Sequence, residues 1–491
     1  MPSKERDILA ASGKPSKGGL EDTVPGWKAG RKHRASLGTR LVASLQLEAQ
    51  EKSSWIATTL QFDQNVDYET LKATLNQRIM TVPRFRSKLV QHSFPKKLSF
   101  QELPESELKM DYLWEEAFPG KVVSDAEVNK YIGNLFDGWY RDESQPLWQM
   151  KFIGETEGGN SCLVIKMSHI LGDGISLVEL LYKLLDQEPE STSESTPAKR
   201  TVSKAKAPKL GLWTKTKVFV GGMLEGVTVV FSAPDKKNTI RLKDITKPSP
   251  QKRCSFSPVI EVARVKELQK LYQYATFNDI LVTLLNLTLR AYFREVDDKA
   301  ALKNKLRAQF PINMRSKKQG AFRNGNTSNY FSFGFINLNV KDSKSISELF
   351  WKTKLGLDKL KNSPAPLMSL KSGRVLEKIL PRKQANDQLL NLSGKATMQL
   401  SNVPGPPGKV TIASATVEDM RFLLFTPLSS YVGLLTYNGK LTASFCMDGA
   451  LADPELISKH WVPEFEKFFA HAKEEAAKQD GLIKPPRTGC F

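Results

Sequence analysis

The chain has 491 residues, of which 40% are hydrophobic and 25% charged, a composition typical of a folded protein with two or three domains. Its formal net charge of +20 comes mostly from two segments: residues 1–43 hold nine basic and four acidic residues, and residues 195–253 hold fourteen basic and three acidic residues. The four cysteines include no CxxC pair and the N-terminus has no apolar core, so we expect neither a disulfide framework, nor a metal site, nor secretion.

The chain begins with the basic segment 1–43, which we interpret as an N-terminal tail, and the first mixed domain is predicted over residues 44–186. Residues 161–168 (SCLVIKMS) are rich in apolar and β-branched residues, which predicts a strand. Residues 175–186 (ISLVELLYKLLD) carry apolar side chains at helical spacing, which predicts a helix. The short segment between them is therefore a turn at the end of a strand.

Residues 187–253 separate the two domains and are interpreted as a basic linker. Residues 187–209 are rich in Ser, Thr, Pro and charge, which is typical of a disordered connection. Residues 210–233 are more apolar, but glycines and Glu225 interrupt a stretch shorter than the roughly 20 apolar residues of a spanning helix. Flanking lysines and aromatic residues favour an interfacial membrane anchor, and a buried helix of a crossover linker is the equal alternative.

The two basic segments favour an anionic partner. A phospholipid headgroup layer suits charge that is confined to a tail and a linker. Nucleic acid is the competing partner, but no zinc-finger spacing, RNP-like aromatic strand or basic helix repeat accompanies the charge, so we expect no nucleic-acid binding. A solvated, disordered tail and linker is the third interpretation.

The second mixed domain is predicted over residues 254–480, followed by a short tail over residues 481–491. Apolar spacing predicts helices over residues 278–296, 346–361 and 455–478, the last despite Pro463. Residues 431–437 and 441–447 flank Asn438 and Gly439, a dipeptide typical of a two-residue hairpin turn. The predicted fold class is therefore α/β, with mixed α+β sheets in two units.

Five histidines are available as a general base: His33, His92, His169, His460 and His471. His33 lies in the tail, His92 follows a strand-like run, and His460 and His471 lie on the last predicted helix. Only His169 falls in a turn between a strand and a helix, where loops commonly present catalytic side chains. His169 is therefore the candidate base.

The spacing around His169 suits this role. Asp173 lies four residues later, where it can brace the turn or pair with a distant arginine. Gly172 and Gly174 allow a tight backbone path. A plain structural turn is the alternative for so short a pattern. The sequence contains no GxSxG elbow, P-loop, HExxH motif or dinucleotide fingerprint, so other common catalytic machineries are not indicated.

Several separated segments together resemble the wax ester synthase/acyl-CoA:diacylglycerol acyltransferase family. Residues 167–174 (MSHILGDG) look like its HHxxxDG active-site motif. Two upstream segments resemble its early P-x-x-R segment and its PLW element: 82–86 (VPRFR) and 145–149 (QPLWQ). Three downstream segments resemble its ND helix start, its P-x-x-x-R strand and its GN element: 277–281 (FNDIL), 311–315 (PINMR) and 325–329 (GNTSN). The last two resemble its final loop and hairpin: 401–406 (SNVPGP) and 437–439 (YNG).

The resemblance implies the fold of CoA-dependent acyltransferases, in which two α/β domains form a channel at their interface. Acyl-CoA, as a co-substrate and without a further cofactor, would enter from one side and the acceptor from the other, meeting at His169. His169 would remove the proton of an acceptor hydroxyl, which attacks the thioester directly. Asp173 would be structural and pair with Arg315, while Gly174 lets the helix start close to the strand. Asn278 would supply or organise oxyanion donors, and a helix N-cap is its equal alternative.

The same resemblance assigns further residues to substrate binding: Ser168, Pro146, Leu147, Trp148, Asp279, Arg315, Asn402, Pro404 and Gly405. Asn402, Pro404 and Gly405 would shape a channel loop, and a plain turn is the alternative. Ser168 is a departure, because it replaces the first histidine of the family's pair. The second histidine, which the family uses as base, is His169, so one imidazole must transfer the proton alone.

The implied reaction transfers a long-chain acyl group to a fatty alcohol, giving a wax ester, or to diacylglycerol, giving triacylglycerol. Both acceptors, the acyl chain length and the oligomeric state stay open. Because such acceptors dissolve in membranes, the basic linker would dock the protein on the cytosolic face of the endoplasmic reticulum or of a lipid droplet. The alternatives are an acyltransferase of the same fold that acts on soluble alcohols or amines, and a non-catalytic lipid-binding relative. The intact His169, Asp173 and Gly174 argue against the last.

Overall fold

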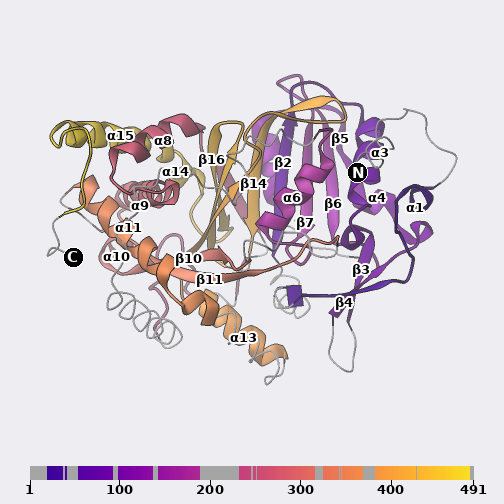
Figure 1. Cartoon of the computed structure of the whole chain (residues 1–491), viewed down its shortest axis with the longest axis horizontal. Helices are drawn as coiled ribbons and strands as arrows, with labels where there is room; N and C mark the ends of the chain where they lie inside the picture. The colour runs from indigo at the N-terminus through magenta and orange to yellow at the C-terminus, as the bar shows by residue number, and fades with distance from the viewer. Residues whose placement is uncertain are drawn as a thin grey trace, which may run out of the picture.

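The computed structural model describes residues 19–36, 39–40, 42, 54–91, 98–135, 142–187, 232–244, 247–249, 251–315, 325–341, 343, 345–368, 382–426 and 428–486. Two sheet-centred halves lie side by side, with the N-terminal half on the right of Figure 1 and the C-terminal half on the left. Each half has its own hydrophobic core. The predicted mixed α/β class with two units is therefore confirmed.

The first sheet has six strands: β2 (Trp55–Phe62), β5 (Trp114–Val123), β6 (Trp148–Thr156), β7 (Cys162–Ser168), β13 (Val410–Ile412) and β14 (Ala415–Phe425). Their order is β13-β14-β2-β7-β6-β5, and only β5 and β6 pair in parallel. Every residue of β7 is buried, which explains its continuous apolar sequence. The helices of this half are α1 (Leu20–Thr23), α3 (Tyr68–Ile79), α4 (Met110–Leu113), α5 (Asp125–Asn134) and α6 (Gly174–Leu184).

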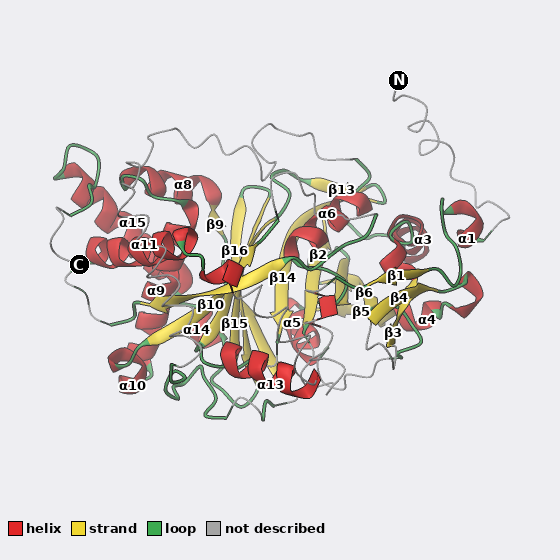
Figure 2. Ribbon diagram, turned by 60° about the horizontal axis from the view of Figure 1, so that its bottom comes forward, coloured by secondary structure: helices red, strands yellow, loops and turns green. Residues whose placement is uncertain are grey.

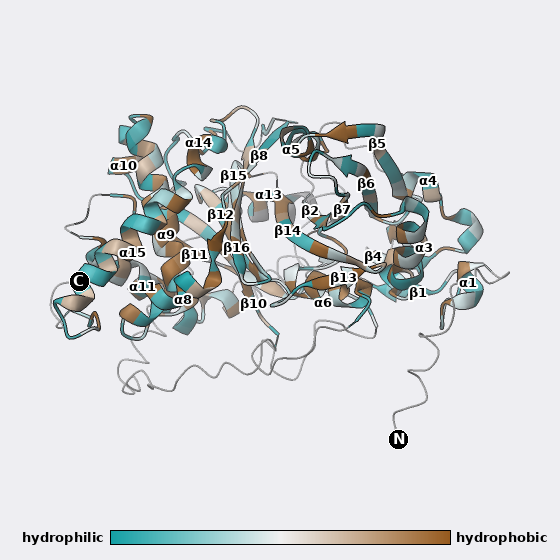
Figure 3. Ribbon diagram, turned by 90° about the horizontal axis from the view of Figure 1, so that it is seen from above, coloured by the Kyte–Doolittle hydropathy of each residue, from teal (hydrophilic) through white to brown (hydrophobic). Residues whose placement is uncertain are grey.

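The second sheet has seven strands: β8 (Lys252–Phe256), β9 (Ile260–Glu261), β10 (Leu306–Asn313), β11 (Phe331–Leu338), β12 (Met398–Pro404), β15 (Ser430–Tyr437) and β16 (Lys440–Asp448). Their order is β11-β10-β12-β15-β16-β8, and β9 also pairs with β16. The helices are α8 (Val262–Leu271), α9 (Phe277–Glu295), α10 (Lys299–Lys303), α11 (Ile346–Asn362), α13 (Arg382–Ser393), α14 (Glu455–Ser458) and α15 (Trp461–Ala477). Hydrophobic residues gather in α9 and the strands (Figure 3), so α9 is the central helix of this half.

Strand β14 crosses from the second half of the chain into the first sheet, where it pairs antiparallel with β2. It also contacts β15 and β16, and it therefore lies between the two sheets (Figure 2). Residues 410–425 belong to the expected second domain in sequence but complete the sheet of the first. Strand β14 therefore connects the two halves.

Part of the expected basic tail is folded. Strand β1 (Lys32–Arg34) pairs with β4 (Leu98–Glu102), which pairs with β3 (Ser87–Gln91) to form a small third sheet. The fully buried carboxylate of Glu102 lies 2.6 Å from the His33 ring and 2.8 Å from the Arg86 guanidinium. The interpretation of residues 1–43 as a tail is therefore corrected for this part, because β1 pairs with β4 and both Arg31 and His33 lie against a buried acid.

Most locally predicted elements are confirmed with small shifts at their ends. Residues 161–168 form β7, residues 175–186 form α6, and the helices predicted over 278–296 and 346–361 are α9 and α11. Asn438 and Gly439 close the predicted hairpin with φ values of 46° and 71°, as a type I′ turn requires. The helix predicted over 455–478 is divided into α14 and α15. Pro463 lies in the first turn of α15, where a backbone N–H has no acceptor within the helix.

The predicted interfacial segment, residues 210–233, lies outside the described residues except for its last two. Just after it, the buried Asp235 accepts a hydrogen bond from Nε of Arg307 at 2.7 Å and from the Thr397 hydroxyl at 2.8 Å. The end of the linker is therefore anchored on the second half. Among the helices in the described part of the chain, none is long and apolar enough to cross a membrane.

Candidate active site

His169 follows β7 directly, in the turn that leads into α6. Its backbone N–H donates to the carbonyl of Ser54 at 2.9 Å, and the N–H of Ser168 donates to the carbonyl of Leu147 at 2.9 Å. The Ser168 side chain is fully buried, and its hydroxyl accepts from the N–H of Ile170 at 3.3 Å. The backbone on both sides of His169 is therefore fixed by neighbouring strands.

The imidazole of His169 has the properties of a neutral base. The residue remains partly exposed, while its Nδ1 atom is buried. Phe331, the first residue of β11, lies edge-on to the imidazole with the ring centroids 5.6 Å apart. Burial lowers the pKa of His169, against the opposing effects of Asp173, of the residue's own carbonyl and of Asn329. The ring is therefore neutral near pH 7, which is the state a general base requires.

Asp173 fixes the turn to the second half of the chain. Its carboxylate caps α6 by accepting from the N–H of Ser176 at 3.1 Å, and it accepts from the N–H of Tyr330 at 2.8 Å. It also pairs with Nη1 of Arg315 at 2.8 Å, and both side chains are at most 8% exposed. The carbonyl of Ser328 accepts from the N–H of Asp173 at 3.3 Å. The predicted Asp173–Arg315 pair is confirmed.

Residues 325–330 (GNTSNY), which we call the latch segment, bind the carbonyl groups of the same turn. The Nδ2 group of Asn329 donates to the carbonyl of His169 at 2.9 Å and to that of Ile170 at 3.2 Å. The hydroxyl of Thr327 donates to the carbonyl of Leu171. Three consecutive carbonyl groups of the turn thus accept side-chain hydrogen bonds from the C-terminal half.

Arg84 supports the turn from the N-terminal half. Its Nη1 donates to the carbonyl of Leu171 at 3.1 Å and to the hydroxyl of Thr39 at 3.3 Å, and its guanidinium lies 4.5 Å from the centre of the Phe100 ring. Burial lowers the pKa of Arg84 to about 10, although Asp173 opposes this change. Thr39 belongs to the expected tail, so this segment also contributes to the surroundings of the site.

Asn278, the second residue of α9, is hydrogen-bonded to Asn402 on β12. Nδ2 of Asn402 donates to Oδ1 of Asn278 at 2.7 Å. Thr276 and Asp279 form the capping box of α9, so the alternative assignment of Asn278 as the N-cap is wrong. Because Oδ1 is engaged, the Nδ2 group of Asn278 is the end of its amide that suits the expected oxyanion donor.

Two expected substrate-binding segments have buried side chains instead. Asp279 is fully buried, accepts from the N–H of Thr276 at 2.8 Å, and pairs with Lys354 and Lys361 at 3.3 and 3.5 Å. Trp148 is 1% exposed, and its Nε1 donates to a backbone carbonyl at 2.8 Å. The neighbours of Trp148 in the PLW element are buried as well: Pro146 and Leu147. Both segments therefore support the fold around the site.

The glycines of the two motifs lie where the halves approach closely. A Cβ atom at Gly174 would lie 3.3 Å from Cγ2 of Val403, the neighbour of Asn402 on β12. A Cβ atom at Gly405 would lie 2.7 Å from the carbonyl oxygen of Thr436. Pro404, at the end of β12, is exposed. Gly174 thus brings the start of α6 against β12 of the other half.

The other histidines have partners away from this turn. His33 pairs with Glu102, the His460 ring lies 2.7 Å from Glu295, and the His471 ring lies 3.2 Å from the Ser347 hydroxyl. His92 lies outside the described residues. Of the four histidines that the structure describes, only His169 lies in the turn that both halves hold.

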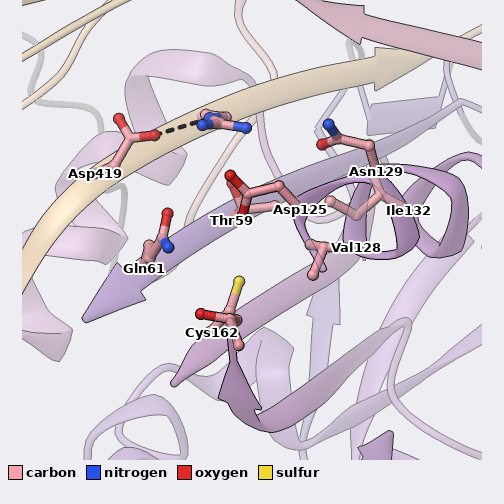
Figure 4. A pocket seen from close by; sticks show the side chains of 10 residues that line it. Thr59, Gln61, Asp125, Val128, Asn129, Ile132, Cys162 and Asp419 are labelled. Atoms are coloured by element: carbon pink, nitrogen blue, oxygen red, sulfur yellow. Dashed lines mark hydrogen bonds and ion pairs between the residues drawn. The ribbon is translucent and has the colours of Figure 1, made fainter. Parts of the chain in front are cut away.

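A polar pocket lies at the opposite end of β7 (Figure 4). Cys162 is the first residue of β7, whereas His169 follows the last. Asp419 and Arg421, paired at 2.8 Å, form one side of the pocket. The space holds about one water molecule. This pocket contains no residue of the predicted site and is separate from it.

Sequence patterns assigned no individual role to three residues around the turn of His169: Asn329, Thr39 and Phe331. Thr39 lies in the segment interpreted as a tail, and Phe331 was not singled out. Asn329 was noted only within the GN element. Its signal was a run of four hydrogen-bonding side chains directly before an apolar strand, a composition that can bind the backbone of another segment.

Comparisons with known sequences identify a family. Residues 42–271 match the wax ester synthase/diacylglycerol acyltransferase catalytic domain, and residues 327–468 match the C-terminal domain of that family. Wax ester synthase/diacylglycerol acyltransferase 6 of Arabidopsis thaliana is 21% identical over 490 residues, which cover 89% of this chain and 94% of that protein. Number 11 from the same plant is 26% identical over 360 residues, which cover 64% of this chain and 70% of that protein.

Solved structures share the fold. The wax ester synthase/diacylglycerol acyltransferase from Marinobacter aquaeolei VT8 matches with a TM-score of 0.58 and 16% identity, over 90% of this chain and all of that one. Trichothecene 15-O-acetyltransferase from Fusarium sporotrichioides matches with a TM-score of 0.59 and 11% identity, over 91% of this chain and 98% of that one. A mutant starter condensation domain of rhizomide synthetase in complex with C8-CoA matches with a TM-score of 0.53 and 11% identity, over 92% of this chain and 96% of that one. The chain is an acyltransferase and belongs to the wax ester synthase/diacylglycerol acyltransferase family.

Proposed function

We propose that this acyltransferase moves a long-chain fatty acyl group from acyl-CoA to the hydroxyl group of a fatty alcohol, of diacylglycerol, or of both. One observation carries the proposal: a neutral, partly exposed imidazole lies in a turn that both halves of the chain hold in place. The names of the relatives support the two acceptors. The C8-CoA complex of a protein with the same fold supports a CoA thioester as the donor.

In the proposed reaction, Nε2 of His169 takes the proton of the acceptor hydroxyl while its oxygen attacks the thioester carbon. The charge that develops on the carbonyl oxygen is stabilised by the amide N–H of Asn278. The carbon–sulfur bond then breaks, the imidazolium returns the proton to the sulfur, and CoA leaves as a thiol. The acyl group passes directly to the acceptor, so acyl-CoA serves as a co-substrate and no acyl-enzyme forms.

The test is an assay with radiolabelled palmitoyl-CoA and either hexadecanol or dioleoylglycerol. We expect His169→Ala to lower product formation about 10²- to 10⁴-fold, the usual contribution of a general base. His460→Ala is the matched control, because it removes an imidazole from the start of α15, and it should retain wild-type activity. Substantial ester formation by His169→Ala would refute the base assignment.

A water-soluble alcohol and a water-soluble amine, added to the same assay, test the acceptor class. We expect transfer to hexadecanol, to dioleoylglycerol, or to both, and little transfer to the soluble compounds. Transfer to the soluble compounds alone would replace the lipid acceptor with the alternative class. Comparison of the two lipids then ranks wax ester synthesis against triacylglycerol synthesis.

We further propose that the basic linker docks the enzyme on the cytosolic face of the endoplasmic reticulum or of a lipid droplet, where such acceptors dissolve. Residues 195–231 hold seven basic residues against one acid, Glu225. Each basic residue near an anionic surface contributes about 1 kcal/mol to binding, so seven of them suffice to dock a protein.

The test replaces these seven residues with glutamine: Lys199, Arg200, Lys204, Lys206, Lys209, Lys215 and Lys217. Replacement is better than deletion through residue 253, which would remove the buried partner of Arg307, Asp235. Binding to vesicles with phosphatidylserine should fall, and wild-type binding should weaken with salt. An equal number of glutamine replacements at surface lysines of α8, α10, α11 and α15 is the control. Equal binding of the linker variant and the wild type would exclude docking by this segment.

A further inference from the structure

We infer that Asn329 is a positioning residue for the base: its Oδ1 accepts a hydrogen bond from Nδ1–H of His169 and so holds the imidazole in the tautomer whose Nε2 is free to take a proton. The inference rests on the proposed role of His169. Asn329 lies in the latch segment of the C-terminal half, 160 positions from His169 in the chain.

The orientation of the Asn329 amide is set by its donor end. The side chain is fully buried, and Nδ2 donates to the carbonyl of His169 at 2.9 Å and to that of Ile170 at 3.2 Å. A flipped amide would place Oδ1 against two carbonyl oxygens, which repel it. Oδ1 is therefore the free acceptor end, held next to His169 because Nδ2 is bonded to the backbone of that residue.

These two hydrogen-bonded residues each contain a buried polar atom without a hydrogen-bond partner among the described residues: Oδ1 of Asn329 and Nδ1 of His169. One is an acceptor, and the other is a donor in one of the two neutral tautomers of imidazole. Unpaired buried groups of this kind are costly, so the pair that satisfies both is favoured. The Asn329 side chain also raises the pKa of His169 against the lowering by burial, as an acceptor for an imidazole N–H does.

The nearby alternatives to Asn329 are occupied. The carboxylate of Asp173, which could orient an imidazole as in a triad, is bonded to Arg315, to the N–H of Ser176 and to the N–H of Tyr330. The hydroxyl of Ser168 accepts from the N–H of Ile170, within the backbone of the turn. The carbonyl of His169 itself also raises the pKa of the imidazole, and Asn329 holds this carbonyl in place by donating to it from Nδ2 at 2.9 Å.

The arrangement has a chemical consequence. A neutral amide fixes the tautomer without adding a charge, whereas a carboxylate in the same place would stabilise imidazolium and raise the pKa of the base. Burial lowers the pKa of His169, so a neutral orienting group keeps the ring ready to accept a proton. The single imidazole of this chain is therefore oriented by an amide from the other half.

The experiment uses the full chain with ¹⁵N-labelled histidine, and the His169 signals are assigned by their loss in His169→Ala. Three variants are compared. Asn329→Leu removes the acceptor and the donor at similar size, Asn329→Asp keeps an acceptor and adds a charge, and Thr327→Val is the matched control. Thr327 bonds the carbonyl of Leu171 in the same turn but does not reach the imidazole. Imidazole ¹⁵N shifts report the tautomer, and kcat/KM is measured against pH.

We expect the Nδ1–H tautomer in the wild type and in Thr327→Val, and a mixture of tautomers in Asn329→Leu. The kcat of Asn329→Leu should fall about 10- to 100-fold, as for other groups that orient a ligand or base, with little change in KM. Asn329→Asp should move the acidic limb of the pH profile to higher pH, which a purely structural role would not do. If Asn329→Leu does not fold, the pH profile of Asn329→Asp still decides.

Two results would overturn the inference: an unchanged Nδ1–H tautomer in Asn329→Leu, or the same mixture in Thr327→Val. An unchanged pH profile in Asn329→Asp would do so as well. The NMR measurement needs no turnover, so it is independent of the proposed function. An active His169→Ala enzyme would refute the base assignment while leaving the Asn329–His169 hydrogen bond intact.

Discussion

Asp173 and Arg315 are 142 positions apart in the chain, and Nη1 of Arg315 lies 2.8 Å from Oδ2 of Asp173. Asp173 begins α6 just after the candidate base, and Arg315 follows β10 of the other sheet. Arg315 also donates from Nη2 to the hydroxyl of Ser176 and to the carbonyl of Ser328, at 3.0 Å each. One guanidinium thus joins the active-site turn, α6 and the latch segment.

Loss of the Asp173 charge should destabilise the fold strongly. Asp173→Asn keeps an N-cap, because asparagine caps helices as well as aspartate, but it leaves the Arg315 charge buried without its partner. We expect a loss of about 3–5 kcal/mol in the free energy of unfolding, measured with urea. Asp173→Asn combined with Arg315→Met should be less destabilised than the sum of the two single variants. Strict additivity would show that the pair is not coupled.

The activity should depend on pH through His169. Because burial lowers the pKa of His169 below its ordinary value of about 6.5, the acidic limb of kcat/KM should lie below pH 6.5. The stability of the fold also depends on the protonation of His169. Unfolded chains take up a proton near pH 6.5 and the folded state only at lower pH, so this contribution to stability falls as pH decreases through that window. His169→Gln should lose less stability than the wild type between pH 6.5 and pH 5. An identical pH dependence of unfolding in both proteins would contradict the lowered pKa.

The amide pair Asn278–Asn402 should act as one unit in transition-state stabilisation. Asn278→Ala removes the proposed donor and should lower kcat about 10²- to 10³-fold, the usual loss for an oxyanion donor. Asn402→Ala removes only the 2.7 Å hydrogen bond that orients it, and the loss should be smaller. The double variant should be no slower than Asn278→Ala. Independent, multiplicative losses would show that the two amides act separately.

Sequence patterns predicted the elements that depend on neighbours in the chain. The apolar spacing in residues 278–296 is a property of one helix, and α9 starts and ends within one residue of the prediction. The strand pairing of β14 with β2 could not be predicted in this way, because β14 mixes buried and half-buried residues and would fit the edge of either sheet. Only the packing of the whole chain selects its partner.

The residues of the candidate site also differ in whether they could be predicted from the sequence. His169 and Asp173 stand out through their position between a strand and a helix, and Arg315 could be proposed as a partner from the family pattern. Asn329 could not be placed, because its function depends on carbonyl groups that the turn presents only when folded. The burial of Trp148 could not be predicted for a related reason: an aromatic residue beside a motif is equally suited to a core and to a ligand site.

Gly405 and Gly408 offer a matched test of the expected channel loop. A Cβ atom at Gly405 would lie 2.7 Å from the carbonyl oxygen of Thr436, which accepts the Gly405 N–H at 2.8 Å, whereas a Cβ atom at Gly408 meets nothing within 4 Å. Gly405→Ala should therefore push β12 away from β15 and destabilise the fold by about 1–3 kcal/mol, while Gly408→Ala changes stability by less than about 0.5 kcal/mol. Urea unfolding measures both values, and equal stabilities would refute the close approach. Below the unfolding transition, a channel loop predicts that Gly405→Ala also raises KM for long-chain acyl-CoA. A plain turn predicts wild-type kinetics in the molecules that remain folded.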